Sequence, residues 1–355
     1  MEATLHALLA GLGQAAQFFW DSLFGLIFGF LISAIAQVML TPATMERYLG
    51  PGLKGVLCGA GFGIISSACS YGAAAAARGF YRSGGDARAI FSFLIASTNM
   101  NLAILILFWS LLGWQFAFAE FFGGIIIIAV VTIVLTLLVG SAELARLQRA
   151  YEGGEESHHH CHGDEPERRD WGAVAATAIA DVKMLRTELV VGYLIAGFAA
   201  ALIPPGWLAA ALHAVGAVPV IGYVLLLVLG LLIAVATFVC SMGNVPIARF
   251  LANAGIPLGA NTSFIYGDLL ILPLIAIYRK SFPPRVTWTF VGLFTAGAML
   301  AGAIMEKAIG SSLGAMEMGS MALNDRFTLV ANAVALAAVL VLAVAVLSRR
   351  RAASG

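Results

Sequence analysis

The chain has 355 residues, of which 61% are hydrophobic and 11% charged, and its mean hydropathy is +0.93. Soluble domains have about 45–50% apolar and about 25% charged residues, so an ordinary water-soluble protein is excluded. The 20 Lys and Arg residues balance 19 Asp and Glu residues. The chain therefore has no positively charged field to attract nucleic acid, and nucleic acid is not expected as a partner. Four cysteines are too few for a secreted disulfide scaffold.

Long apolar segments predict an all-α polytopic membrane protein in a lipid bilayer, because a spanning helix needs about 20 apolar residues. With two broken stretches, Gly55–Tyr81 and Cys240–Gly255, we expect roughly 8–10 membrane segments. The broken stretches are either re-entrant hairpins or discontinuous spans. The continuous spans, in chain order, are Phe18–Leu40, Ala89–Leu112, Gln115–Gly140, Leu189–Ile203, Val218–Val239, Leu258–Tyr278, Val286–Ile304 and Phe327–Leu347.

One polar segment, residues 141–170, divides the chain. We predict transmembrane repeat 1 over 1–140, a cytoplasmic His-rich loop over 141–170, transmembrane repeat 2 over 171–310, and an extra transmembrane helix with a basic tail over 311–355. Short loops rich in Lys and Arg stay in the cytoplasm, which places the N-terminus outside and the C-terminus inside. The loops with this charge are Arg78–Arg88, Arg146–Arg186, Arg279–Arg285 and Arg349–Arg351.

The chain resembles itself at an offset of 171 residues. The pattern C-S-x-G-x4-A-R-x5-G begins at Cys69 and again at Cys240, with six fixed positions in register. Downstream, the segment from Asn101 resembles the segment from Asp268, with an offset that is four residues shorter. With the orientation above, the two motif segments enter the membrane from opposite sides. We therefore predict two inverted-topology repeats with broken or re-entrant helices, whose motifs meet at a substrate site near the midplane.

The chemistry of the motif suits such a site. A Ser-x-Gly break frees backbone N–H and C=O groups, which are tolerated at membrane depth only inside protein or beside a wet cavity. Ser70 and Ser241 can cap the following helix, and the preceding cysteines are soft ligands for Cu(I) or a trivalent arsenical. In the alternative interpretation each cysteine is a small buried hydrophobe. The predicted substrate-binding residues are Cys69, Ser70, Gly72, Asn99, Asn101, Cys240, Ser241, Gly243, Asn244 and Asp268.

Asp268 lies near the middle of a predicted span, where burying a charge is costly. It is expected to carry a coupling proton or to neutralise a cationic substrate; the alternative is a structural hydrogen bond to a neighbouring helix. The three asparagines add uncharged ligand contacts or join helices. Three other acidic residues lie nearer the predicted span ends and receive no role: Asp21, Glu120 and Glu188.

The polar loop carries the run His158-His159-His160-Cys161-His162. Imidazole and thiol groups suit Zn, Cu or Ni, so these five residues are a predicted metal site that captures or senses a Cu or Zn ion. The alternative is a low-complexity tract, because no structural zinc spacing is present. No P-loop, G-x-S-x-G, H-E-x-x-H or Rossmann fingerprint occurs, so we expect neither ATP drive nor an enzyme, and no required cofactor.

These residues resemble the predicted permeases of the YraQ/ArsP type over nearly the whole chain. The resemblance rests on Cys69-Ser70-Tyr71-Gly72-Ala73, Ser97-Thr98-Asn99, the stretch from Trp114 to Gly124, Cys240-Ser241-Met242-Gly243-Asn244-Val245-Pro246, Asp268-Leu269 and Leu272-Pro273. It implies a bacterial inner-membrane permease, with relatives linked to efflux of trivalent organoarsenicals and others, often with His-rich loops, linked to copper or zinc efflux. Some metal-efflux relatives have a Cys-Ser-Cys core, whereas Tyr71 and Met242 stand at the third position here.

Together these observations predict a secondary active permease that exports a small thiophilic metalloid compound or soft metal ion by alternating access. The alternative from another class is a transmembrane thiol–disulfide oxidoreductase that uses Cys69 and Cys240. Against it, the chain has no C-x-x-C motif, and mere thiol exchange does not need the shared Ser, Gly and Arg. A scaffold protein is the third interpretation, but it would not need polar breaks at membrane depth.

Overall fold

The computed structural model describes residues 2–39, 48–66, 70–82, 84–140, 143–144, 146–147, 171–202, 221–237, 241–310 and 329–340. In the first half the helices are α1 (Glu2–Met39), α3 (Leu53–Ser66), α4 (Ser70–Arg82), α5 (Ala87–Asn99), α6 (Leu102–Leu112) and α7 (Trp114–Val139). The second half has α9 (Trp171–Leu202), α11 (Ile221–Thr237), α12 (Ser241–Asn253), α13 (Leu258–Tyr266), the 3-10 turn η1 (Gly267–Leu270), α14 (Leu272–Ser281), α15 (Pro284–Met305) and the π-helical turn η2 (Glu306–Gly310). Leu329–Leu340 is a further short apolar helix.

Within the described residues, three helical segments are long and apolar enough to cross a membrane: Ala87–Leu112, Trp114–Val139 and Pro284–Gly310. A fourth span results if the pair Leu258–Leu270 and Leu272–Ser281, bent by 49°, is counted as one. The fold is therefore that of an all-α polytopic membrane protein. The expected spans at 89–112, 115–140 and 286–304 agree with these helices to within a few residues, apart from the extension of α15 into η2.

Two long helices reach well beyond the apolar segments predicted for them. α1 begins at Glu2, although the predicted span began at Phe18, and α9 begins at Trp171, although the span was expected from Leu189. The added turns are rich in Ala and Leu, which favour helix even where the sequence is too polar for a span. Helix length and span length therefore differ in both places.

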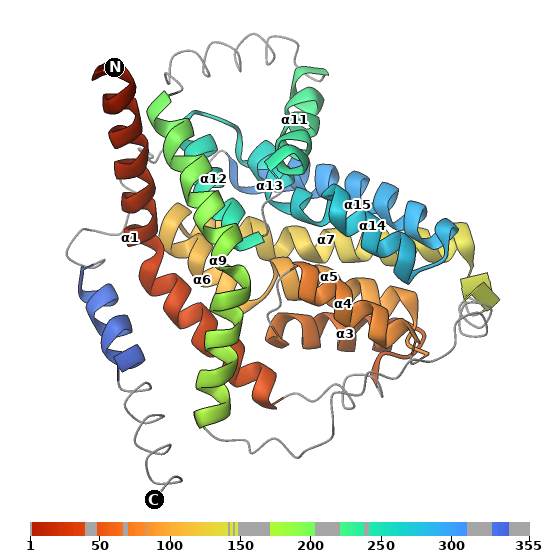
Figure 1. Cartoon of the computed structure of the whole chain (residues 1–355). Coiled ribbons are helices and arrows are strands. Elements are labelled where there is room, and N and C mark those ends of the chain that lie inside the picture. Colours follow the sequence, from red (N-terminus) through yellow and green to blue (C-terminus); the bar gives the residue numbers. More distant parts are fainter. Residues whose placement is uncertain are drawn as a thin grey trace, which may run out of the picture.

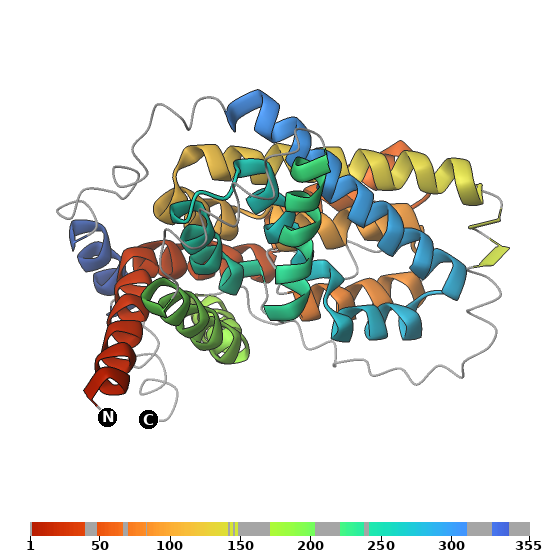
Figure 2. The same cartoon turned by 90° about the horizontal axis from the view of Figure 1, so that it is seen from above.

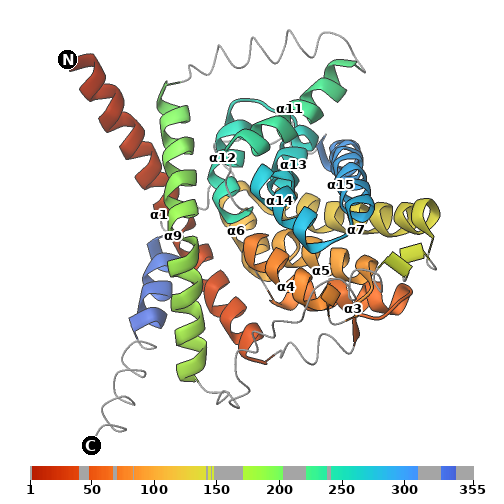
Figure 3. The ribbon, with the colours of Figure 1, turned by 45° about the vertical axis from the view of Figure 1, so that its right-hand side comes forward.

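α1 and α9 cross side by side, and the other described helices of the two halves pack together next to them (Figure 1). Viewed from above, α7 (yellow) lies along one edge of this bundle and α15 (blue) crosses it obliquely (Figure 2); the two helices are in contact. Figure 3 shows α4 and α14 close to one another between the two halves, where they are in contact. The reciprocal contact, α6 with α12, is also present.

Close helix packing recurs at the same spacing in the two halves. A Cβ atom at Gly59 of α3 would collide with the backbone oxygen of Ala89 in α5, and one at Gly230 of α11 would collide with the backbone oxygen of Ala260 in α13. Only glycine permits such an approach of two backbones, as in other membrane helix pairs. The two collisions involve positions that are related by the offset of the sequence motif.

One turn further along, each crossing pairs one glycine with one alanine, but the two residues occupy opposite partners in the two halves. At the crossing of α3 with α5, a Cβ atom at Gly63 would lie 2.7 Å from the Cβ atom of Ala96. At the crossing of α11 with the turn after α13, the alanine is Ala234 and the glycine is Gly267. Each crossing therefore holds one methyl group, but on opposite partners.

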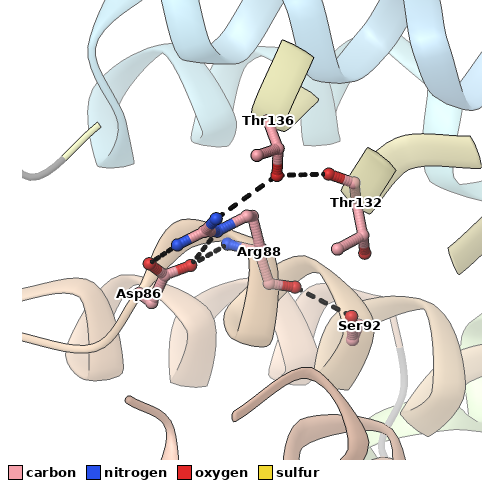
Figure 4. Close-up of polar contacts among 5 residues, drawn as sticks. All are labelled: Asp86, Arg88, Ser92, Thr132 and Thr136. Carbon is pink, nitrogen blue, oxygen red and sulfur yellow. Dashed lines mark hydrogen bonds and ion pairs between the residues drawn. The ribbon is translucent and has the colours of Figure 1, made fainter. Parts of the chain in front are cut away.

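A hydrogen bond from Arg88 holds the start of α5 against the end of α7, and a buried ion pair with Asp86 fixes the position of that arginine (Figure 4). Arg88 donates from Nη2 to Asp86 Oδ2 at 2.7 Å and from Nη1 to Thr136 Oγ1 at 3.3 Å. Asp86 also caps α5 by accepting a hydrogen bond from the backbone N–H of Arg88. Arg285, at the start of α15, pairs with Glu143 just beyond the end of α7. The α4–α5 connection, the end of α7 and the start of α15 therefore lie on one side of the molecule.

The connection between α12 and α13 lies on the other side. The backbone N–H of Gly259, at the start of α13, donates to Glu306 Oε2 at 2.7 Å, and Glu306 directly follows the end of α15. Since α15 is 22 residues long, its ends are separated by about 33 Å. The two connections that follow the repeated motifs are thus at opposite ends of α15.

Candidate functional site

The repeated motifs converge on one carboxylate. Ser70 is the first residue of α4 and Ser241 is the first residue of α12. The Ser70 hydroxyl donates to Asp268 Oδ2 at 2.7 Å, and the Ser241 hydroxyl donates to the same oxygen atom. The two serine oxygens are 3.3 Å apart. Residues that are 171 positions apart in the chain therefore bind one atom of a third residue.

Asp268 owes its position to a break in the helix. It lies in η1, between α13 and α14, and its side chain is fully buried. Ile271 has an extended backbone and precedes Leu272-Pro273 at the start of α14, and proline cannot supply the N–H that a continuous helix would need there. The carboxylate consequently sits at a bend inside the membrane bundle, where broken helices are tolerated only within protein or beside a cavity.

Several polar atoms at this site have no hydrogen-bond partner. They are Asp268 Oδ1 and both amide atoms of Asn99 and of Asn244. Asn99 lies near Asp268, although no hydrogen bond of standard geometry joins the two side chains. Asn244 follows Ser241 by one helical turn and so lies on the same face of α12. All three side chains are fully buried. Buried polar groups in proteins are nearly always paired, so these atoms are the ones that can accept a ligand.

Glu120 of α7 is a residue of this site that the sequence interpretation missed. Its side chain is fully buried and neither carboxylate oxygen has a hydrogen-bond partner. It was assigned no role because it lies near the end of its predicted span. The available signal was that Glu120 is the only acidic or basic residue between positions 115 and 140.

Tyr266, in the last turn of α13, joins Glu120 to the helix break. Its hydroxyl donates to the backbone oxygen of Glu120, and a Cβ atom at Gly123 would lie 3.1 Å from that hydroxyl. Tyr266 is followed by Gly267 and Asp268. The same short segment therefore contacts α7 through Tyr266 and carries the carboxylate of Asp268. Tyr266 thus ties the backbone of Glu120 to the short segment that carries Asp268.

The structure gives Asn101 a local task. Its Oδ1 accepts a hydrogen bond from the N–H of Ile104 at 2.9 Å, which caps α6, and its Nδ2 donates to the backbone oxygen of Ser97 at 2.7 Å. Asparagine is among the preferred N-cap residues. When the helices of the two halves are matched in chain order, α6 is matched with α14. The N-cap residue Asn101 of α6 is then matched with Ile271, the N-cap residue of α14, and not with Asp268.

The motif glycines have two kinds of environment. Gly72 and Gly243 lie in the first turn of α4 and α12, and a Cβ atom at Gly192 of α9 would lie 3.0 Å from Gly243 Cα, so α9 passes close to α12 there. The last motif position, Gly84 or Gly255, has φ of 91° or 88°, a conformation that other residues rarely adopt. These two glycines end the motif with matching turns.

Other predicted site residues lie outside the described residues: Cys69, Cys240, His158, His159, His160, Cys161 and His162. Within the part of the chain that the structure describes, no group of three or more His, Cys, Asp or Glu residues could hold a metal ion. The described part of the site is built from hydroxyl, amide and carboxylate groups.

A bundle of membrane helices with a buried polar site at a helix break defines a multi-pass membrane protein of the transporter class. The chain belongs to the ArsP_1 family, described as "Predicted permease", whose model matches residues 13–307. It is similar to a Mycobacterium tuberculosis protein named "Putative permease Rv2963", with 35% identity over 268 residues, which is 71% of this chain and 65% of that protein. No solved structure matches the chain significantly.

Proposed function

We propose that this permease is a secondary active transporter that exports a thiophilic metalloid compound or soft metal ion by alternating access through the site at Asp268. The observation that carries the proposal is that Ser70 and Ser241, one from each motif, donate to the same oxygen atom of Asp268. Because the site is built from both halves, its geometry changes when the halves move relative to one another. Alternating access requires a substrate site whose geometry changes in this way.

The proposal includes an inverted repeat. Three observations support it: helices of the two halves follow in the same order, close contacts recur at the motif offset, and the two motif connections lie at opposite ends of α15. In this interpretation the α4–α5 connection faces the cytoplasm and the α12–α13 connection faces outward. The N-terminus is then outside and the C-terminus inside, in the inner membrane of a bacterium.

The proposed substrate class follows from the cysteine that precedes each of the two serines, Cys69 and Cys240. Thiolates prefer soft ions such as Cu(I) and trivalent arsenic, and the YraQ/ArsP resemblance points to the same class. The loop residues His158, His159, His160, Cys161 and His162 are proposed to capture a Cu or Zn ion on the cytoplasmic side. Protons are the proposed coupling ion, with Asp268 as their carrier.

Uptake into everted membrane vesicles tests the proposal. The panel contains Cu(I), Zn(II) and trivalent arsenicals, and the variants are Cys69→Ser/Cys240→Ser and Ser70→Ala/Ser241→Ala. Cys58→Ser is the matched control, since Cys58 lies in α3 outside both motifs. We expect the wild type and the Cys58→Ser variant to accumulate one of these species. In both double variants the initial rate of uptake should fall by about tenfold or more.

The outcomes separate the parts of the proposal. Accumulation that survives in Cys69→Ser/Cys240→Ser would keep the transporter but reject ligation by sulfur. Accumulation that survives in Ser70→Ala/Ser241→Ala would reject the shared serine site. If the wild type accumulates none of the species, the proposed substrate class is wrong.

One contact favours the redox alternative. The residues directly after Cys69 and Cys240 have hydroxyl oxygens only 3.3 Å apart. As an oxidoreductase, the protein would exchange its two thiols with a partner disulfide, so that a Cys69–Cys240 disulfide forms while the partner is reduced to two thiols. Isolation of that disulfide from native membranes, together with a wild type that transports nothing, would select this function.

A further inference from the structure

We infer that Glu120 and the free oxygen of Asp268 together bind a small monovalent cation, H⁺ or Na⁺, which makes Glu120 a second acidic residue of the central site. The inference concerns the same site as the proposed function. Binding of a cation can be measured without transport, however, so the two can fail separately.

The carboxylate oxygens of Asp268 and Glu120 outnumber the hydrogen-bond donors that reach them. Asp268 Oδ2 receives both serine hydroxyls, whereas Asp268 Oδ1 and both oxygens of Glu120 receive none. A hydroxyl has one proton to donate, so Ser70 and Ser241 have none left for these atoms. An ionised carboxylate buried without compensation costs several kcal/mol. Three carboxylate oxygens at one site therefore need a positive partner.

Within the described residues, the elements that pack against α7 supply Glu120 with no such partner. Arg88 of α5 is bound to Asp86 and Thr136 at the far end of α7, about 24 Å along the helix from Glu120. Arg285 of α15 pairs with Glu143 beyond that same end.

Near Glu120 itself the remaining groups that are not exposed are neutral or acidic. Tyr266 of α13 donates its hydroxyl proton to the backbone oxygen of Glu120, and not to the carboxylate. Glu306, which follows α15, accepts the N–H of Gly259, and Lys307 beside it is exposed. Around Asp268, α14 presents the neutral Tyr278, while its Arg279 and Lys280 are exposed. Arg78 of α4 and Arg249 of α12 each lie eight residues, about 12 Å along the helix, beyond the serine that binds Asp268. The described neighbours therefore leave the two carboxylates to share a cation from solution.

The chemistry of the unpaired atoms indicates the kind of cation. Carboxylate and amide oxygens are hard ligands that suit small cations such as Na⁺, and carboxylates also take up H⁺. The unpaired Asn99 and Asn244 amides add two more oxygen atoms to the set. One carboxylate comes from each half of the chain, Glu120 from α7 and Asp268 from η1. A bound cation would thus join the halves, and its release would free them.

Thermal unfolding of the purified protein in detergent tests the inference, because a ligand that binds only the folded state raises the unfolding midpoint. The midpoint is measured at increasing Na⁺, with choline replacing it at constant ionic strength, and at a series of pH values. If Na⁺ binds, the midpoint of the wild type rises with Na⁺ concentration. If H⁺ binds, the midpoint is insensitive to Na⁺ and rises as the pH is lowered.

Glu120→Gln and Asp268→Asn should each flatten whichever dependence the wild type shows, while Glu143→Gln should leave it unchanged. Glu143 is the matched control because it is exposed and paired with Arg285. Should Glu120→Gln not fold, Glu120→Asp withdraws the carboxylate by one methylene group and should reduce the dependence too. Equal Na⁺ and pH dependence in the wild type and in the Glu120 variant would overturn the inference, whether or not the protein transports a metal.

Discussion

Asp268 has two serine donors on a single oxygen atom, and this geometry predicts how the three residues depend on one another. Removing one hydroxyl leaves Oδ2 with the other donor, whereas removing both leaves a buried carboxylate oxygen without any. An unsatisfied buried acceptor costs about 1–3 kcal/mol, and more when it is charged. The two losses should therefore not be additive.

We expect Ser70→Ala and Ser241→Ala each to lower the thermal unfolding midpoint slightly, and the double variant to lower it by more than the sum. The interaction energy from this double-mutant cycle should be on the order of 1 kcal/mol. Ser110→Ala is the control, since Ser110 is buried and bonds only within its own helix, to Leu107 at 2.9 Å. Additive losses, or the same cycle energy in an Asp268→Ala background that has no side-chain acceptor, would contradict the shared carboxylate.

Individual residues also show what the sequence could indicate locally. The position of Asn101 before a Leu-rich helix was a cap signal, and the structure shows that cap; its predicted contact with substrate stays a prediction. Glu120 was assigned no role because its depth in the membrane was judged from its distance to the end of the predicted span. Its backbone oxygen accepts a hydrogen bond from Tyr266, which is 146 residues away in the chain, and hydropathy along α7 contains no information about that contact.

At the scale of helices, the packing of α3 on α5 and of α11 on α13 depends on single glycines. We expect Gly59→Ala and Gly230→Ala to lower the unfolding midpoint, because each added methyl group would collide with a backbone oxygen of the partner helix. Overpacking of this kind costs about 1–3 kcal/mol.

The matched control lies in the same helix. A methyl group added at Gly61 of α3 would have no other atom within 4 Å, so Gly61→Ala should be neutral or stabilise the helix by up to about 1 kcal/mol. Fluorescence-detected size-exclusion after heating would compare the three variants. Equal behaviour of Gly59→Ala and Gly61→Ala would show that the close approach is not needed for stability.

Helices were predicted from sequence where one local property is sufficient. The apolar runs gave the spans of α5 with α6, of α7 and of α15 to within a few residues, and the repeated motif marked the residues that begin α4 and α12. The convergence of those two helix starts on η1 was not predictable in detail. It depends on contacts between residues that are 27 and 198 positions apart in the chain, which no short pattern encodes.

At the scale of the molecule, the predicted membrane orientation can be tested on the two ends of α15. The loops predicted to be cytoplasmic are Arg78–Arg88, Arg146–Arg186 and Arg279–Arg285. The contacts of Arg88 with Thr136 and of Arg285 with Glu143 bring the end of the first segment, the start of the second and the end of the third to one side of the bundle. Lys307, at the other end of α15, lies on the opposite side.

We therefore expect a cysteine at position 280 to react with an impermeant maleimide in everted vesicles, and one at position 307 to react in right-side-out vesicles. Lys280 and Lys307 are both exposed, so accessibility is limited only by the membrane. The unsubstituted protein measures the reaction of its own four cysteines. Labelling of both positions from the same side would rule out α15 as a membrane-crossing helix.

The exchange of glycine and alanine between the two crossings has a consequence for how the chain can change over generations. Each crossing holds a fixed volume, filled by Ala96 against Gly63 in one half and by Ala234 against Gly267 in the other. In the second half, exchanging the two residues together would keep one methyl group in the crossing, because a Cβ atom at Gly267 meets closely only the Cβ atom of Ala234. In the first half the same exchange would fail, because a Cβ atom at Gly63 would also lie 2.7 Å from the backbone oxygen of Phe93. The two crossings therefore differ in which paired substitutions they can tolerate, although they are related by the motif offset.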